Sequence, residues 1–233
     1  MIWLPGIDYL PMSIADYDNS KLTIFFSIRG EGTAALASFK DKVVGIVGPL
    51  GKPLSINTRS RYLLVAGGTG LAPIIRLAKE LNSLGIPTTI VWGTRKGENV
   101  GEVPTFFKEI TGLDLHICTE DCSIGFCGKA IDLVNELIPK LKPAEIVAAG
   151  PNDMLAEIAY LSFKSGINPV LILESIIKCG LGVCGSCVLG TTGLRLCKEG
   201  PAIKASKVID YLIKYLPESR RKEVISKGLP YVT

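Results

Sequence analysis

Four cysteines near one end of the chain follow the spacing C-x4-C-x2-C-x9-C. They are Cys179, Cys184, Cys187 and Cys197. Close cysteine spacing of this kind brings four thiolates together on a pair of irons. Gly180, Gly182 and Gly185 lie between them and allow the tight turns and close backbone approach that such a loop needs. The spacing predicts a [2Fe–2S] site on a loop, with backbone N–H groups directed at its sulfurs.

Two other interpretations of these four cysteines stay open. Cysteine is among the most buried residue types, so the four are also compatible with core thiols. Four cysteines also bind zinc, but zinc sites favour two C-x2-C pairs and this stretch has one. The remaining cysteines, Cys118, Cys122 and Cys127, lie outside the motif and are interpreted as incidental thiols.

Composition excludes several classes of protein. The chain has 233 residues, 47% of them hydrophobic, which suffices for a core in one or two domains. The net charge of +4 is small and the basic residues are dispersed, so no nucleic-acid partner is expected. No stretch has the roughly 18 unbroken apolar residues of a membrane span, and the N-terminus lacks signal-peptide features, which favours the cytoplasm. An odd number of cysteines argues against a disulfide framework, and the single histidine, His116, argues against histidine-centred catalysis.

The region from residue 20 to 57 contains short extended segments separated by glycine and proline. Extended segments are predicted at 21–28 and 42–51, with a glycine-rich turn at 29–33 between them. This pattern is typical of a small antiparallel sheet or barrel.

From Arg61 onward, apolar runs alternate with helical periodicity. Strands are predicted at 61–66, 88–93, 113–119, 145–150 and 170–175, and helices at 71–85, 129–142 and 153–166. This alternation predicts a parallel α/β unit. The tail after residue 206 begins with an amphipathic pattern. The predicted domains are residues 1–57, 58–167 and 168–233.

Two glycine loops follow strands of the predicted parallel sheet. Gly67, Gly68 and Gly70 precede a helix, so their backbone is placed to meet a pyrophosphate at the helix N-terminus. Gly150 and Pro151 end another strand before a helix. Because ligands lie at the carboxyl ends of parallel strands, both loops are predicted to face one nucleotide. A plain strand–helix turn also explains the first loop, whose spacing differs from G-x-G-x-x-G.

The segments GGTGLAP, GPNDM and the cysteine loop, in this order, resemble the iron–sulfur branch of the ferredoxin–NADP reductase superfamily. Within that branch, LESIIKCGLGVCGSC and RLCKEGPAI are most similar to the electron-transfer subunits of dihydroorotate dehydrogenase. The resemblance covers nearly all of the chain up to about residue 210. It implies an α/β plus β fold, with an N-terminally shortened antiparallel FAD-binding barrel, a Rossmann-like parallel α/β nucleotide domain and a C-terminal [2Fe–2S] loop subdomain.

The resemblance also implies which residues bind the flavin. Ser13 matches the serine of an Arg-Pro-x-Ser motif that lies against the isoalloxazine ring, and Gly32-Thr33 matches the pair that holds the FAD phosphates. Leu10 and Ser27 stand where the family has arginines, and Arg29 is a candidate substitute. Met1 aligns inside the family's barrel. The full set is Leu10, Pro11, Met12, Ser13, Phe25, Phe26, Ser27, Gly32 and Thr33.

The function implied by the resemblance is electron transfer in pyrimidine biosynthesis. Electrons would pass between the FMN of a catalytic partner subunit, in a heterotetramer, and NAD or another acceptor, through the [2Fe–2S] cluster and FAD. A flavin exchanges electrons in pairs or singly, whereas a [2Fe–2S] cluster carries one, so no acid or base is needed on this chain. Two alternatives stay open: a subunit of a sulfide dehydrogenase, ferredoxin–NADP reductase or hydrogenase diaphorase, and a zinc- or cluster-bearing interaction subunit without catalysis.

Overall fold

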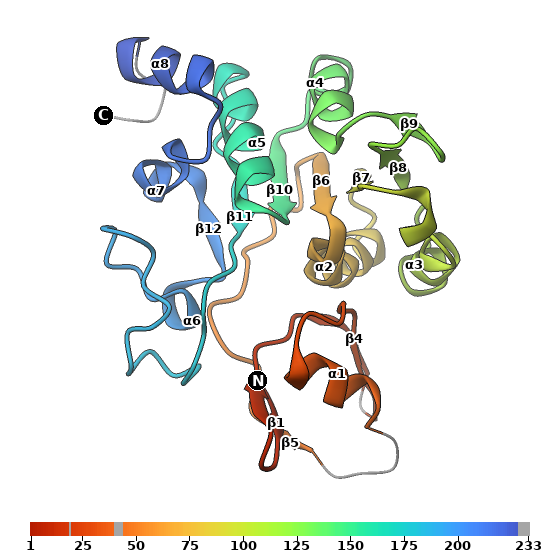
Figure 1. Cartoon of the computed structure of the whole chain (residues 1–233). Helices are drawn as coiled ribbons and strands as arrows, with labels where there is room; N and C mark the ends of the chain where they lie inside the picture. The colour runs from red at the N-terminus through yellow and green to blue at the C-terminus, as the bar shows by residue number, and fades with distance from the viewer. Residues whose placement is uncertain (19, 40–43, 228–233) are drawn as a thin grey trace.

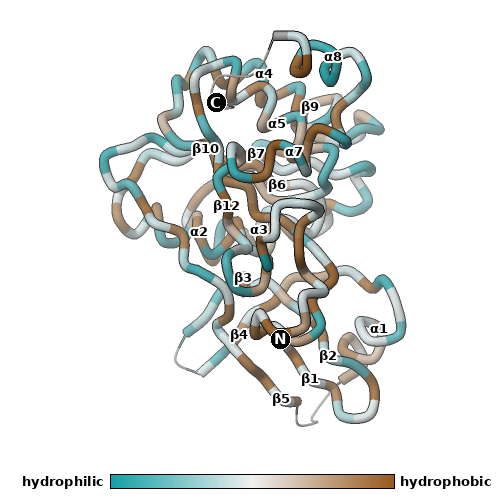
Figure 2. The backbone as a smooth tube through the Cα atoms, turned by 90° about the vertical axis from the view of Figure 1, so that its left-hand side faces the viewer, coloured by the Kyte–Doolittle hydropathy of each residue, from teal (hydrophilic) through white to brown (hydrophobic). Residues whose placement is uncertain are grey.

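The computed structural model describes residues 1–18, 20–39 and 44–227. A large sheet with helices on both faces forms most of the molecule, and two small antiparallel sheets form the rest (Figure 1). The small sheets lie at the end of the molecule opposite the last helix, α8 (Glu218–Lys227), in both Figure 1 and Figure 2. No helix in the described ranges is long and apolar enough to cross a membrane.

The large sheet has seven strands in the order β12-β11-β10-β6-β7-β8-β9. Neighbouring strands are parallel except β11 and β12. The central strands are continuous apolar runs because both faces of the sheet are covered. The predicted parallel α/β unit is confirmed. The strands are β6 (Tyr62–Gly67), β7 (Thr88–Thr94), β8 (His116–Thr119), β9 (Phe126–Cys127), β10 (Glu145–Ala149), β11 (Val170–Ile172) and β12 (Ala202–Lys204).

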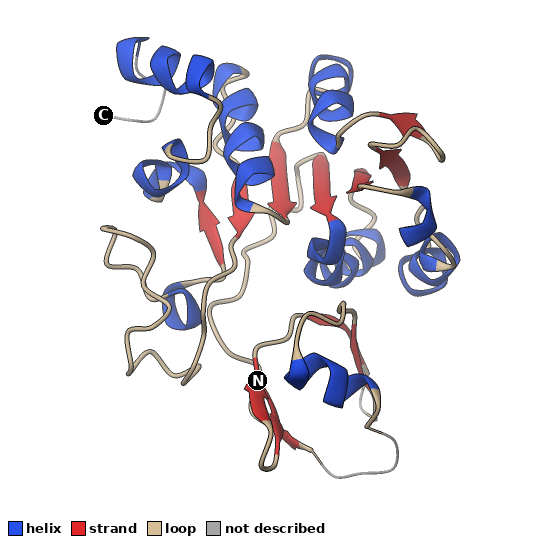
Figure 3. Ribbon diagram, viewed as in Figure 1, coloured by secondary structure: helices blue, strands red, loops and turns tan. Residues whose placement is uncertain are grey.

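Helices cover both faces of this sheet (Figure 3), and each face has its own hydrophobic core. Successive side chains of β6 point to opposite faces, so Leu63 and Val65 enter one core while Leu64 and Ala66 enter the other. The first core is closed by α4 (Ala130–Leu141), α5 (Asn152–Lys164), α7 (Ile209–Ile213) and α8, and the second by α2 (Leu71–Ser83) and α3 (Val103–Thr111). The central strands, labelled in Figure 2, form the layer between the two cores.

The N-terminal region forms two antiparallel sheets in the part of the chain that the structure describes. One has the order β2-β1-β5, and the other pairs β3 with β4. The predicted antiparallel structure is thus present, while closure into a barrel stays a prediction. Lys42 and Val43, which begin one predicted extended segment, lie outside the described residues. The strands are β1 (Ile2–Leu4), β2 (Asp8–Leu10), β3 (Ile14–Tyr17), β4 (Leu22–Ile24) and β5 (Gly45–Ile46).

Two local predictions are wrong. The glycine-rich turn at 29–33 opens a helix, α1 (Glu31–Ala37), because Thr33 completes a capping box and Ala34, Ala35 and Leu36 favour helix. The strand predicted at 21–28 ends at Ile24, so Phe25, Phe26 and Ser27 lie in the loop that leads to this helix. In the tail, the helix predicted for the first half is present as α7, and Pro217 separates it from α8, which was not predicted.

An ion pair joins the N-terminal sheets to the large sheet's helical layer. Asp16 on β3 accepts hydrogen bonds from Lys79 Nζ on α2, at 2.8 Å to each carboxylate oxygen, and Arg76 Nη1 lies 3.6 Å away. Burial is the largest single effect on Asp16 and opposes its charge, but the hydrogen bonds from Lys79 and the Tyr17 backbone, with the charges of Lys79 and Arg76, together outweigh it, and the pKa of the carboxyl falls below its usual 3.8. The charged form of Asp16 therefore stabilises this junction.

We expect Asp16→Asn to lower the free energy of unfolding by about 1 kcal/mol at pH 7. A depressed carboxyl pKa contributes stability above its unfolded value and loses it as pH falls through the folded value. The difference between wild type and variant should therefore shrink between pH 5 and pH 3 in urea unfolding curves. Asp114→Asn is the control, because its ion pair with Lys108 is mostly exposed. An equal loss in both variants, unaffected by pH, would contradict the assignment.

Candidate functional site

The four motif cysteines lie on one long loop between two adjacent strands of the large sheet. The loop leaves β11 and returns at β12, and its ends are joined by a hydrogen bond from Leu173 N to Pro201 O of 3.1 Å. A short helix, α6 (Leu196–Glu199), carries Cys197 into the interior. Cys187 and Cys197 are 1% and 6% exposed, Cys179 is half-buried and Cys184 is exposed.

The sulfurs are arranged as two pairs. Cys187 Sγ lies 3.3 Å from Cys197 Sγ, and the thiols of Cys179 and Cys184 also interact directly. In the described residues, no group of three or more His, Cys, Asp or Glu side chains converges on a single metal ion. A structural zinc site needs four ligands around one ion, whereas a cluster of two irons takes two protein ligands on each. The pairing therefore fits a [2Fe–2S] cluster better than zinc.

Backbone N–H groups point at these sulfurs. Leu181 N lies 3.4 Å from Cys179 Sγ, and Gly182 N lies 3.2 Å from Cys197 Sγ. Hydrogen bonds from the backbone of Cys184, Leu181 and Val183 lower the pKa of the Cys179 thiol to about 6. Burial, in contrast, raises the pKa of Cys197 to about 11. The thiolate form is thus favoured at Cys179, whereas at Cys197 burial opposes it and a nearby positive charge would offset that cost.

Gly182 is the tightest point of the loop. Its φ of +75° lies in the left-handed region, and a Cβ there would come within 2.6 Å of the Lys198 side chain. Glycine therefore lets the backbone pass close enough for its N–H to reach Cys197.

A cavity of about 410 Å³ joins the predicted flavin segment to the cysteine loop. It is lined by Asp8, Tyr9, Leu10 and Pro11 on one side and by Ser175, Ile176, Ile177 and Lys178 on the other. Its volume falls in the range of small-molecule sites, about 300–1,000 Å³. The structure thus brings Leu10 and Pro11 beside the residues that precede Cys179. The sequence placed residues 175–178 in the segment LESIIKCGLGVCGSC that leads to the cysteines, but no local pattern in it indicated contact with residues 8–11.

The N-terminal region touches the cysteine loop at a second place. Lys52 N donates to Gly200 O at 2.6 Å, and a Cβ on Gly180 would meet Leu50 Cδ1 at 2.9 Å. The loop that holds the cysteines is therefore packed directly against the predicted flavin-binding region.

The predicted phosphate-binding pair begins α1. Thr33 Oγ1 accepts hydrogen bonds from the N–H groups of Arg29 and Gly30 and donates to Gly30 O. Asp8 lies against Gly32 and leaves no room for a side chain there. The Thr33 hydroxyl is thus used to cap the helix, and Arg29 is the cation of this turn.

The two glycine loops meet at the carboxyl edge of the large sheet. Gly70 and Gly67 pack against backbone or side-chain atoms of residues 149–154, and Gly150 packs against Gly67. Gly68 differs, because it has φ of +52°, is exposed, and has open space where a Cβ would lie. Trp92 Nε1 donates to Gly68 O at 3.0 Å and fixes this peptide group. Three of these glycines are therefore required by packing, and Gly68 is the one that faces solvent.

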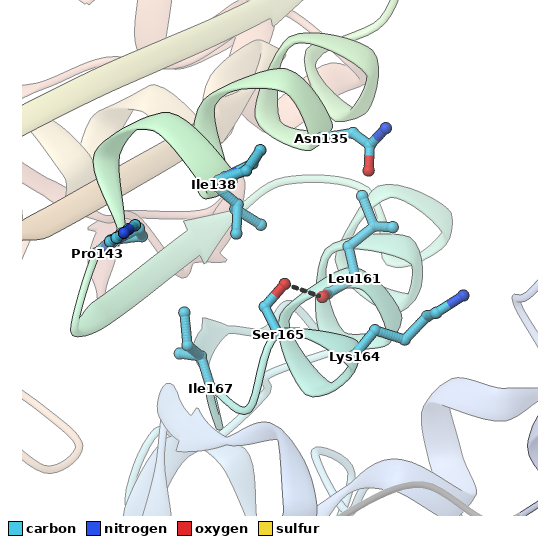
Figure 4. A pocket seen from close by; sticks show the side chains of 9 residues that line it. Asn135, Ile138, Pro143, Leu161, Lys164, Ser165 and Ile167 are labelled. Atoms are coloured by element: carbon cyan, nitrogen blue, oxygen red, sulfur yellow. Dashed lines mark hydrogen bonds between the residues drawn. The ribbon is translucent and has the colours of Figure 1, made fainter.

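Two features differ from the predicted site. Cys122 and Cys127 form a disulfide at the β8–β9 turn, so their interpretation as incidental thiols is wrong, whereas Cys118 is a buried free thiol. A larger cavity of about 600 Å³ lies between the C-terminal ends of α4 and α5 (Figure 4). It opens at the edge where β10 and β11 begin, opposite the glycine loops, and no predicted site residue lines it.

Comparison with known proteins gives concordant matches in sequence. Residues 174–209, which include all four cysteines, match the family model of the iron–sulfur cluster binding domain of dihydroorotate dehydrogenase B. The chain is 32% identical over 212 residues to a probable dihydroorotate dehydrogenase B (NAD(+)), electron transfer subunit, of Methanocaldococcus jannaschii, covering 89% of this chain and 78% of the relative. The corresponding subunit of Enterococcus faecalis is 33% identical over 226 residues, with 89% and 84% covered.

A solved structure shares the fold. The structure of an NADH-dependent reduced ferredoxin–NADP oxidoreductase matches with a TM-score of 0.76 and 24% identity, covering 94% of this chain and 81% of that one.

Proposed function

Because the chain belongs to the family of dihydroorotate dehydrogenase B electron transfer subunits, we propose that it carries electrons between the FMN of a catalytic partner subunit and an acceptor. The chain is accordingly the electron-transfer part of an oxidoreductase, and the oxidation of dihydroorotate belongs to the partner. One observation carries the proposal: the four cysteine sulfurs form two pairs, and the loop that holds them shares a cavity with residues 8–11 of the predicted flavin-binding segment.

The residues proposed to hold the [2Fe–2S] cluster are the two cysteine pairs. The buried pair, Cys187 and Cys197, would hold one iron, and Cys179 with Cys184 would hold the other. The cluster supplies single-electron transfer when bound. The chain's own contribution is to keep the buried pair dry and to direct the N–H groups of Leu181 and Gly182 at sulfur.

The residues proposed to hold FAD lie in two segments: one begins at the wall of the smaller cavity with Leu10 and Pro11, and the other leads into the first turn of α1. Leu10, Pro11, Met12 and Ser13 would lie along the ring system, and the segment from Phe25 to Thr33 would run beside the phosphates. Arg29 is the nearest substitute for the arginines absent at Leu10 and Ser27. Its guanidinium Nε donates to Ser27 Oγ at 3.0 Å, which orients it at this turn.

A nicotinamide nucleotide is the proposed acceptor, with Gly68 and the Gly150-Pro151 turn at the carboxyl edge of the sheet. Gly68 is the loop residue whose surface is open, and its peptide is held by Trp92. Gly67, Gly70 and Gly150 support this loop by close packing.

The partner subunit is proposed to dock over the cysteine loop. Cys184 is exposed, and three apolar side chains near it in the sequence are exposed as well: Ile176 at 72%, Leu181 at 61% and Val183 at 83%. Exposed apolar groups gathered around one loop are typical of a protein interface. A heterotetramer, two copies of each subunit, is the proposed assembly.

Purified chain is expected to contain iron, labile sulfide and flavin, and to show flavin and cluster absorption. Mixed with an FMN-containing dihydroorotate-oxidising subunit, it should transfer electrons from dihydroorotate to an acceptor. The acceptor can be identified in the reverse direction, by following reduction of the chain with NADH or with NADPH in a stopped-flow instrument. Each subunit alone is the control, and the chain alone should not oxidise dihydroorotate. A colourless protein containing zinc, or turnover of dihydroorotate by the pure chain, would refute the proposal.

A further inference from the structure

One charged pair on the cysteine loop is bonded to the backbone that faces the buried sulfurs. Arg195 Nη2 lies 2.6 Å from Glu199 Oε1, and Glu199 Oε2 also accepts from Arg195 Nε and from its backbone N. The free arm of the guanidinium, Nη1, donates to Gly182 O at 3.0 Å. We call these two side chains the charged clamp.

The charged clamp and Cys197 hold Gly182 from both sides. The Gly182 N–H donates to Cys197 Sγ at 3.2 Å, and its carbonyl accepts from Arg195. Gly182 has no side chain of its own to hold it, and its backbone is in the left-handed region. The hydrogen bond from Arg195 holds the peptide group that follows Gly182 and the bond to Cys197 holds the one that precedes it, so together they restrict the backbone rotation of Gly182.

The clamp also brings the positive charge of Arg195 to the buried sulfur pair, with the Glu199 carboxylate bonded directly to that guanidinium. Arg195 interacts electrostatically with both Cys197 and Cys187, and it is 38% exposed while Glu199 is 25% exposed. At such partly exposed positions, charge–charge interactions are screened less than in bulk water. Lys198 is a further cation of this loop; its aliphatic side chain packs against Gly182, and the residue as a whole is exposed.

We propose that Arg195 and Glu199 are positioning residues that set the reduction potential of the cluster, Arg195 raising it and Glu199 lowering it. This inference rests on the proposed function, since it presumes a [2Fe–2S] cluster on the four cysteines. Reduction adds one negative charge, so a neighbouring cation favours the reduced form and a neighbouring carboxylate opposes it. The N–H held on Cys197 Sγ acts in the same direction as the cation.

The test is a potentiometric titration of the whole chain, followed by the electron paramagnetic resonance of the reduced cluster. Arg195→Gln should decrease the equilibrium constant for reduction about fivefold, and Glu199→Gln should increase it by a similar factor, as expected for one unit charge at a partly exposed site. Arg195→Lys keeps the positive charge but loses the planar guanidinium that bonds Glu199 and Gly182 O together. The reduction potential of its cluster should therefore lie between those of wild type and Arg195→Gln.

Matched controls are Arg76→Gln and Glu80→Gln on α2. This pair has the same spacing in the sequence and a 3.2 Å contact, and its ion pairs among the described residues are with each other and with Asp16 on β3. Both control variants should leave the potential unchanged.

The outcomes separate this inference from the proposed function. If wild-type protein contains no iron, the proposed function fails. If wild type contains the cluster but Arg195→Gln and Glu199→Gln shift the potential in the same direction, or not at all, the charged clamp is only structural and the inference is overturned. If Arg195→Gln does not assemble a cluster, the other two variants test the inference. Glu199→Gln should raise the reduction potential and Arg195→Lys should lower it, and shifts in the same direction would overturn the inference.

Discussion

Cys184→Ala is expected to remove the cluster without unfolding the chain. Cys184 is exposed, so its thiol contributes little to the core, yet two irons need all four thiolates. Iron content should fall to background. The rate of electron transfer from the FMN subunit to the acceptor should fall by more than about 100-fold, because loss of a ligand costs more than loss of a residue that only hydrogen-bonds to a ligand. Iron analysis, visible absorption and coupled turnover measure the change.

The double variant Cys122→Ser/Cys127→Ser is the matched control for this experiment. It removes two exposed cysteines that form a disulfide far from the motif in sequence. Its iron content and turnover should equal those of wild type. Normal iron content in Cys184→Ala, or loss of iron in the control, would show that the cluster is bound elsewhere.

Gly70→Ala is expected to destabilise the fold by about 3 kcal/mol through overpacking. Gly70 has ordinary right-handed dihedrals, so the effect is one of space. A Cβ would collide with the carbonyl group of Ala149 and lie 2.7 Å from Gly150 N. Both neighbours are backbone atoms of the central strand β10 and the turn after it, so α2 would have to move away from the sheet. Urea unfolding measures the loss.

Gly68→Ala distinguishes a glycine proposed to contact the nucleotide from a glycine, such as Gly70, that is required by packing. A Cβ on Gly68 would meet no atom within 4 Å, and the left-handed backbone alone should cost about 1 kcal/mol. Binding of a nicotinamide nucleotide should weaken, because the added methyl group stands on the exposed face of the loop. A larger loss of stability in Gly68→Ala than in Gly70→Ala would reverse this assignment.

Patterns of local origin were predictable from the sequence. The apolar run at β6, the glycine stop after α2 and the cysteine spacing each reflect a short-range rule, and the structure has these elements at nearly the predicted positions. Helix α1 was not predicted, because Gly30 and Gly32 favour a turn and the capping box formed by Thr33 overrides that preference.

Contacts between distant segments were not predictable. The wall of the smaller cavity joins residues 8–11 to residues 175–178, and no periodicity links the two. The disulfide between Cys122 and Cys127 depends on the turn that β8 and β9 make. For the charged clamp there was a signal in the sequence, an arginine and a glutamate four residues apart around Cys197, but its meaning depends on where Gly182 O lies.

The cysteine loop begins and ends on adjacent strands, with Ile172 paired to Ala202 and Leu173 bonded to Pro201. The sheet therefore closes this loop whether or not a metal is present, and the entropy of closing a long loop is not left for metal binding to overcome. We expect protein stripped of iron to keep its two cores and to take up iron and sulfide again without refolding. The same geometry makes the order of events simple: Cys187, Leu189, Leu196 and Cys197 are already packed into the first core by folding, so assembly of the cluster can follow folding rather than drive it.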